Sequence, residues 1–328
     1  MVLFIKTLFA DSGKNLFSLK GVNSVNYDIE VKFEELYEFI ISLHTYLCRK
    51  SHKKIDLTSV WAEEIRGRII PPAASRFDEA EINGDWKITY LIILLCPVPE
   101  RADLFLNWLE GLSTGDLYEL LDGYINQFPE NMTAYRSKLL HLFSDWYELY
   151  FRHLDGTVTA ALREEAARQK ALLALQPGET FVEDATNGLI FRPVPGQEKL
   201  LLIPQYHFQP LNVIYHYGRL TLCHYNARIY PEKGEGLSPH DMRIIRCLGE
   251  ASRLKILRFL HEKPRTYSEI VRHLKLSKGI THDHISKLRS AGLIYGYLEG
   301  ETLTEYGLRV KNLSYVQEQI RHYIEKEG

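Results

Sequence analysis

The segment that most constrains this chain runs from Leu276 to Leu293. Thr281, Ile285 and Leu288 recur at positions i, i+4 and i+7, so they share one face of a helix and can pack on a core. A second face carries small or hydrogen-bonding side chains, namely Gly279, His282, Asp283 and Ser286. Such a helix suits the major groove of DNA, although a surface helix of any globular domain could show the same spacing.

The sequence around this segment predicts a winged helix-turn-helix. Ser277 stands at an N-cap position, and Gly292 stands where a helix would end. N-cap signals also mark the starts of three earlier helices, at Ser238, Ser252 and Thr266. A hairpin is expected around Glu299-Gly300-Glu301, followed by a long closing helix from Tyr306 to Glu327 whose apolar stripe suits a partner helix.

Residues 238–328 resemble the ArsR-type repressors. The run from Leu248 to Leu257, LGEASRLKIL, is similar to the LADPTRLRIL opening of that family, and the run from Leu276 to Leu293 is similar to its LS…HL…LREAGL motif. The resemblance implies a homodimeric transcription regulator, a repressor, that binds double-stranded DNA with one recognition helix per protomer. The first and last helices of the domain would form the dimer interface.

The same resemblance assigns DNA contacts. Base edges would face Lys278, Gly279, His282 and Asp283, and phosphates would lie near Ser277, Ser286, Lys287 and Arg289. Two features depart from the family pattern. Phosphates would repel Asp283 unless it accepts from a cytosine amino group, and the wing carries Glu299 and Glu301 where the family is usually basic.

The metal sites of the family are not expected here, and neither is a cofactor. The cysteine pair that many relatives carry on the first helix of the helix-turn-helix is absent. On the last helix, His322 and Glu325 have the spacing of half a zinc site, but the other half would fall on Arg309 and Lys311, which cannot bind a metal ion. Four residues of the hairpin region could converge, although hydrogen-bonded sheet histidines are the commoner arrangement; they are His207, His216, Cys223 and His224. Scattered cysteines suit a reducing compartment.

The fold class expected is α+β, mainly helical. We predict a helical N-terminal domain over residues 1–176, a β-rich part of β-hairpins over 177–230, a linker over 231–237 and the winged helix-turn-helix over 238–328. One hairpin is expected to pair Phe181–Asp184 with Leu189–Phe191 through a turn at Asn187-Gly188.

Composition favours a globular cytoplasmic protein without a membrane span. The apolar run from Tyr90 to Val98 is far shorter than the ~20 residues that a membrane helix needs, and Met1–Ala10 is expected to be a strand rather than a signal peptide. Residues 237–328 hold 16 Lys+Arg and 11 Asp+Glu, whereas the remainder is acidic. This asymmetry is typical of a nucleic-acid-binding module attached to another domain.

Three functions remain to be compared. The first is a sequence-specific DNA-binding regulator, in which the aromatic-rich residues 133–225 either form an apolar pocket for a small organic effector or only a core. The second is a protein–protein interaction module with a winged helix that does not bind DNA. The third is an enzyme with its site in residues 1–230, which we disfavour because no nucleophile elbow, Walker loop or HExxH motif occurs in the sequence.

Overall fold

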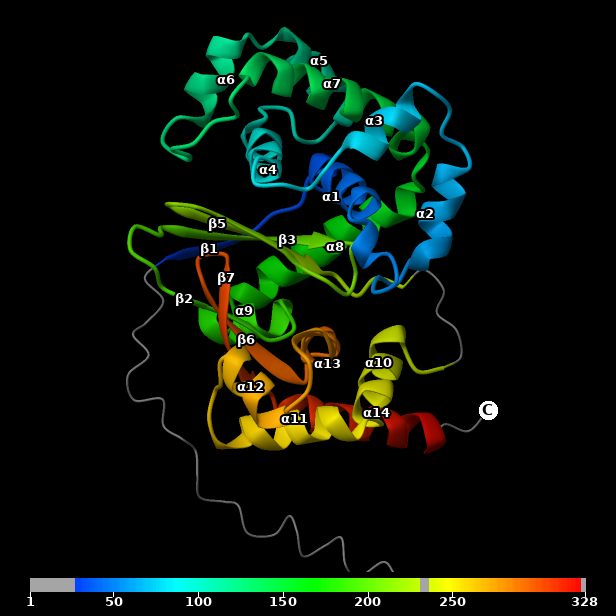
Figure 1. Cartoon of the computed structure of the whole chain (residues 1–328), viewed down its shortest axis with the longest axis vertical. Helices are drawn as coiled ribbons and strands as arrows, with labels where there is room; N and C mark the ends of the chain where they lie inside the picture. The colour runs from blue at the N-terminus through cyan, green and yellow to red at the C-terminus, as the bar shows by residue number, and fades with distance from the viewer. Residues whose placement is uncertain (1–26, 231–235, 326–328) are drawn as a thin grey trace, which may run out of the picture.

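The computed structural model describes residues 27–230 and 236–325. Figure 1 shows helices α1 to α7 above a central sheet, helices α8 and α9 below it, and the C-terminal helices at the opposite end of the molecule. The predicted α+β, mainly helical fold class with a C-terminal helix-turn-helix region is confirmed.

The central sheet has the strand order β1-β3-β5-β4. Strands β1 (Asp28–Val31), β3 (Lys199–Gln205) and β5 (Leu220–Asn226) are parallel, and β4 (Val213–Tyr217) runs antiparallel to β5 at the edge. Every residue of β3 except its first is buried, and so is every residue of β5. Strands buried on both faces need covering helices on each side, and here α1 and α8 both contact β3.

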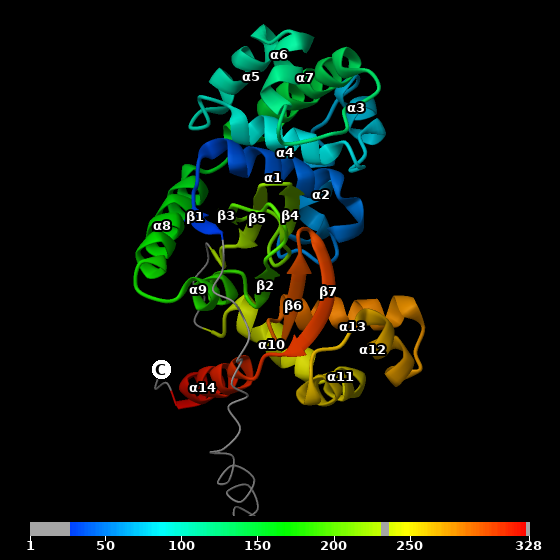
Figure 2. The ribbon, with the colours of Figure 1, turned by 90° about the vertical axis from the view of Figure 1, so that its left-hand side faces the viewer.

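The N-terminal helices form around α1 (Glu35–Leu47), in which every residue from Leu36 to Leu47 is buried. Because α1 is buried on every side, it lies in the interior of the region, and Figure 2 shows α1 between the sheet and the outer helices. The remaining helices of this region are α2 (Thr58–Arg66), α3 (Ala73–Glu79), α4 (Trp86–Leu95), α5 (Ala102–Gly111), α6 (Thr114–Leu121), α7 (Met132–Leu149), α8 (Gly156–Leu173) and α9 (Gly178–Ala185), with 3-10 turns η1 (Arg49–Ser51) and η2 (Phe151–His153).

Aromatic side chains fill the interior of this region. The Phe39 ring packs edge-on against Phe143 at 5.5 Å and against Phe151 at 5.2 Å between centroids. Trp146 is fully buried beside them, and its indole donates to the Ser42 hydroxyl at 2.9 Å. These aromatic residues therefore serve as core.

The C-terminal region is a winged helix with its own apolar core, which includes Ile256, Ile270 and Leu288. The cores of the two regions are separate clusters of buried side chains. The elements are α10 (Pro239–Leu248), α11 (Ala251–Glu262), α12 (Tyr267–Leu274), α13 (Lys278–Ser290), β6 (Ile294–Glu299), β7 (Thr302–Leu308) and α14 (Lys311–Glu325).

The structure corrects the predicted hairpin at residues 181–191. Phe181–Asp184 lies in helix α9, because Pro177 precedes its first turn and Phe181, Val182 and Ala185 pack at helical spacing. Strand β2 (Leu189–Arg192) pairs instead in parallel with the wing strand β6, giving a second sheet of order β2-β6-β7. A strand of the N-terminal region thus extends the wing sheet, whereas β4 and β5 form an antiparallel hairpin within the part where β-hairpins are expected.

Smaller differences concern helix ends. The closing helix begins at Lys311 rather than Tyr306, because Tyr306 belongs to β7 and exchanges backbone hydrogen bonds with Arg265. Glu250, not Ser252, caps α11, and its carboxylate accepts from the Ser252 amide at 3.2 Å. The predicted strand at Met1–Ala10 and most of the linker lie outside the described residues. The domain boundaries at 176, 230 and 237 stay predictions.

Candidate nucleic-acid interface

Helix α13 has the two faces that its sequence predicts. Thr281, Ile285 and Leu288 are buried against the winged-helix core. The Ser277 hydroxyl accepts from the Ile280 amide at 3.3 Å and caps the first turn. Gly292, with φ of +66°, lies just past the end of the helix. These three features fix the start, the buried side and the end of the helix, and so determine which side chains face outward.

The residues expected to contact DNA come together along the outer side of α13, with one exception. Ser277, Lys278, Gly279, His282 and Lys287 are exposed, and Asp283 and Ser286 are partly exposed. The Lys287 ammonium lies 2.7 Å from the Asp283 carboxylate, one turn away. This ion pair offsets the negative charge on the outer face of the helix, although an exposed pair of this kind adds little to stability.

Arg289 is the exception. Its guanidinium turns toward the N-terminal region and donates to the main-chain carbonyls of Asn187 at 2.6 Å and Thr186 at 3.1 Å. Burial and the nearby Arg309 charge lower the pKa of Arg289 to about 10, so the group still carries its charge at neutral pH. In this structure Arg289 joins the two regions and is not placed to contact a phosphate.

Tyr267 is a residue of this site that the sequence reasoning missed. Its hydroxyl donates to the Lys278 carbonyl at 2.6 Å, and its ring meets the His282 ring edge-on at 6.5 Å between centroids. The contact holds the first turn of α13 against α12. The signal in the sequence is an aromatic residue directly after the Thr266 cap, which is too weak a pattern to identify by itself.

The acidic wing is docked on the N-terminal region. The Glu301 carboxylate accepts from the His216 amide on β4 at 2.8 Å and lies 3.7 Å from the Lys87 ammonium. The Glu299 carboxylate lies 3.4 Å from the Arg192 guanidinium on β2. The acidic residues that depart from the family pattern are therefore used in contacts within the chain, and Figure 2 shows the β6–β7 hairpin reaching the central sheet.

A buried arginine lies at the junction of the two regions. Arg309 precedes α14, and its side chain is only 3% exposed. The guanidinium donates to Asn312 Oδ1 at 2.8 Å, Asn187 Oδ1 at 3.2 Å and Glu183 Oε1 at 3.1 Å. Several bonds from one buried charge offset its desolvation cost. Arg309 therefore ties α9 and the turn before β2 to the start of α14.

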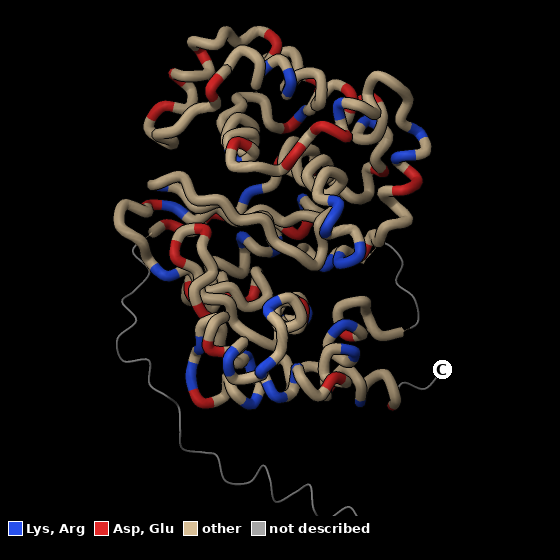
Figure 3. The backbone as a smooth tube through the Cα atoms, viewed as in Figure 1, with Lys and Arg blue, Asp and Glu red and all other residues tan. Residues whose placement is uncertain are grey.

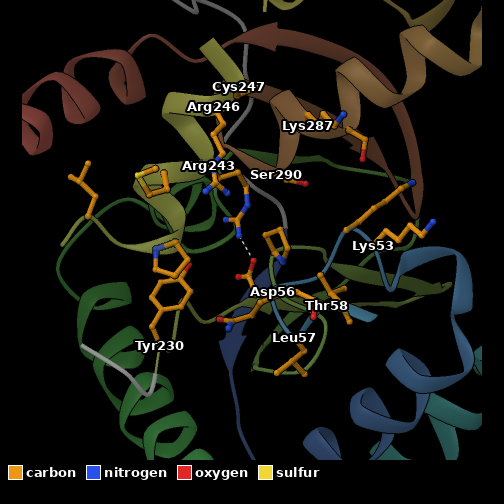
Figure 4. Close-up of a pocket in the computed structure, with 18 of the residues that line it drawn as sticks. Lys53, Asp56, Leu57, Thr58, Tyr230, Arg243, Arg246, Cys247, Lys287 and Ser290 are labelled. Atoms are coloured by element: carbon orange, nitrogen blue, oxygen red, sulfur yellow. Dashed lines mark hydrogen bonds and ion pairs between the residues drawn. The ribbon is translucent and has the colours of Figure 1, made fainter. Parts of the chain in front are cut away.

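A cleft of about 1180 Å³ separates the recognition helix from the N-terminal region. One wall consists of Asp283, Ser286, Lys287 and Ser290, which repeat at i, i+3, i+4 and i+7 and so share the outer face of α13. The facing wall is the loop from Lys53 to Thr58, and Figure 4 shows both walls with Arg243 of α10 between them. The last two turns of the outer face of α13 thus line a cleft, whereas its first turn is exposed.

Lys and Arg gather around this end of the molecule. Figure 3 shows them concentrated over the C-terminal helices, while acidic residues are spread over the N-terminal region and the wing. A basic surface around an exposed helix is the electrostatic pattern of a nucleic-acid-binding domain.

The N-terminal region contains a buried Glu–His–Tyr network but no sign of an activated nucleophile within it. The His207 ring nitrogen Nδ1 lies 2.5 Å from Glu38 Oε1, and Nε2 lies 2.6 Å from the Tyr150 hydroxyl. Burial raises the pKa of Tyr150, which is the opposite of what a reactive phenolate needs. Glu38 also accepts from the amides of Tyr206 and His207, so the network anchors the end of β3 on α1.

Within residues 27–230 and 236–325, no group of three or more His, Cys, Asp or Glu side chains is arranged to hold a metal ion. Over the same part of the chain, none of the helices combines the length and apolarity required to cross a membrane.

Comparison with known proteins gives one match. Residues 251–295, from the start of α11 to the start of β6, match the family described as bacterial regulatory protein, arsR family. No curated protein and no solved structure matches the chain. The matched residues contain the helix-turn-helix pair α12–α13 and the whole outer face of α13. Residues 251–295 therefore form an ArsR-type helix-turn-helix, the DNA-binding element of a transcription regulator, and the chain carries it beside a large N-terminal region that the match does not cover.

Proposed function

We propose that this protein is a sequence-specific repressor that reads DNA as a homodimer and uses its N-terminal region as a sensor. The observation that carries the proposal is the exposed first turn of α13, where Lys278, Gly279 and His282 face solvent on a helix capped by Ser277. In helix-turn-helix proteins, the N-terminal residues of the recognition helix contact base edges. The resemblance to ArsR-type repressors supports repression of transcription rather than activation.

The dimer is supported by apolar side chains on the last helix. Val316 packs inward, and α14 contacts α10. Tyr323 and Ile324, by contrast, are 52% and 73% exposed, and Tyr315 is also exposed. Several large apolar side chains on one exposed helix are typical of an interaction surface. A second copy of the chain would place two recognition helices about one turn of DNA apart.

The sensor role is supported by the way the two regions are joined. The outer face of α13 lines the cleft formed with the Lys53–Thr58 loop, and the wing and Arg309 are bonded to the N-terminal region. A change in the N-terminal region would therefore be transmitted directly to the DNA-reading surface. No catalytic step is part of this proposal.

Two substitutions on α13 test which residues read sequence. We expect His282→Ala to lower the preference for the operator over random duplex about 10-fold, because a good base contact contributes ~1–3 kcal/mol of discrimination. Lys278→Ala should in addition weaken binding to every sequence, because it removes a positive charge from the surface that faces the DNA. Fluorescence anisotropy with labelled duplexes at several salt concentrations measures both effects.

The matched control is Lys170→Ala, which removes an exposed lysine from α8, a helix that does not line the cleft beside α13. It should leave affinity and preference unchanged. If His282→Ala and Lys170→Ala have the same operator preference as the unmodified protein, and Lys278→Ala binds as tightly, then α13 does not read DNA in the way proposed.

A further inference from the structure

The cleft between α13, α10 and the Lys53–Thr58 loop contains more basic than acidic side chains. Six cationic side chains line it, from Lys53, Lys54, Arg243, Arg246, Arg253 and Lys287. The two acidic residues are already paired, Asp56 with Arg243 and Asp283 with Lys287. Among the described residues, no salt bridge involves Lys53, Lys54 or Arg246. The cleft thus carries an excess of positive charge on both walls.

The charged groups in the cleft also retain unused hydrogen-bonding capacity. Asp56 Oδ2 and Arg243 Nη1 are buried atoms without a hydrogen-bond partner in the described part of the chain. Arg243 lies in the middle of the cleft, between the loop and α13 (Figure 4). Because a buried polar group without a partner costs free energy, the Arg243 nitrogen has room for an acceptor in the cleft, and the Asp56 oxygen has room for a donor.

The rest of the lining suits an organic molecule rather than a bare ion. Apolar or aromatic side chains from both regions complete the cleft, among them Leu57, Pro210, Ile229, Tyr230 and Met242. Ligand sites typically combine such a lining with a few placed charges in ~300–1,000 Å³. The cleft of about 1180 Å³ slightly exceeds the upper end of that range, so it has room for a small organic molecule.

We propose that this cleft binds a small organic polyanion that carries phosphate or carboxylate groups. Lys53, Lys54 and Arg246 supply the charge, and Arg243 Nη1 supplies a donor. Because Ser286 and Lys287 belong to the outer face of α13, a bound polyanion lies where DNA would approach that helix. Occupancy therefore lowers DNA affinity. This last step rests on the proposed repressor function, whereas binding of the polyanion does not.

The binding arm uses inorganic tripolyphosphate as the probe and isothermal titration calorimetry of the full chain. Lys53→Gln combined with Lys54→Gln should weaken tripolyphosphate binding about 10-fold or more, a loss of at least 1.4 kcal/mol. Lys138→Gln combined with Lys170→Gln removes the same charge from exposed positions of α7 and α8 and should leave binding unchanged. No binding to the unmodified protein, or equal binding by both double variants, would overturn the proposal.

The DNA arm measures operator affinity with tripolyphosphate and with sodium chloride at the same ionic strength, because salt alone weakens DNA binding. Tripolyphosphate should lower the affinity of the unmodified protein by a further ~5–150-fold and that of the Lys53→Gln, Lys54→Gln variant by much less. If that variant instead loses DNA affinity without tripolyphosphate, the cleft holds the DNA backbone and the proposal is wrong. If no DNA is preferred by any protein, the calorimetry still decides the binding site, and only the repressor function fails.

Discussion

Arg309→Leu is expected to lower the free energy of unfolding by about 3 kcal/mol, as removing one partner of a buried ion pair usually costs ~3–5 kcal/mol. The lower end applies because Lys311 still pairs with Glu183 after the change. Asn187 and Asn312 would lose a donor in the buried junction. Urea-induced unfolding followed by circular dichroism measures the loss.

The control for this prediction is Arg321→Leu. Arg321 lies on α14, its side chain is 70% exposed, and it is 4.0 Å from Glu325. Surface substitutions of this kind change stability by less than ~0.5 kcal/mol. If the two variants lose the same amount of stability, the Arg309 contacts do not hold the two regions together in the way described.

Acidification from pH 7 to pH 5 is expected to destabilise the folded protein by about 6 kcal/mol, or ~2 kcal/mol for each of three buried histidines. Burial lowers the pKa of His44, His224 and His240 to about 3. The Trp86 indole donates to His44 Nδ1 at 3.2 Å, which requires that nitrogen to be unprotonated. His240 also faces the positive charges of Arg228, Arg243 and Arg309.

Acidification lowers the stability because the unfolded chain takes up protons on these histidines and the folded chain does not. A histidine with a pKa near 6.5 in the unfolded chain and a lowered value in the folded chain stabilises the fold above pH 6.5, and this contribution is lost as the pH falls toward 3. Urea titrations at half-unit pH steps measure the slope. His224→Phe should reduce the slope between pH 5 and 6 by about one proton, whereas an unchanged slope would contradict the assignment of His224 as a neutral buried group.

The winged helix could be predicted from sequence because its signals are local. Ser277, Thr281, Ile285 and Leu288 lie within four turns of one another, so caps and helical spacing determine α13 without help from the rest of the chain. Helix α9 could not be predicted in the same way. Phe181–Asp184 is short, with two apolar residues followed by two acidic ones, and such a segment can be helix or strand until its packing partners are known.

The joint between the two regions depends on contacts over long sequence separations, and these leave no local pattern. Arg289 looks like a phosphate contact because it is a basic residue at the end of a recognition helix, yet its partners Thr186 and Asn187 lie about a hundred positions earlier in the chain. An acidic residue such as Glu301 is unexpected on a DNA-binding wing, and the structure explains it by its contacts with His216 and Lys87. The cleft opposite α13 could not be predicted from the sequence either, because its lining residues come from segments far apart in the chain.

The central claim is that α13 gives this protein a preference for one DNA sequence. Its most direct test is the affinity of the unmodified protein for duplexes covering its own upstream region, compared with random duplex at 50 and 200 mM salt. We expect a preference of ~10³-fold or more for one site, with affinity that falls steeply as salt rises. Equal affinity for all duplexes, or no binding at the lower salt concentration, would contradict it.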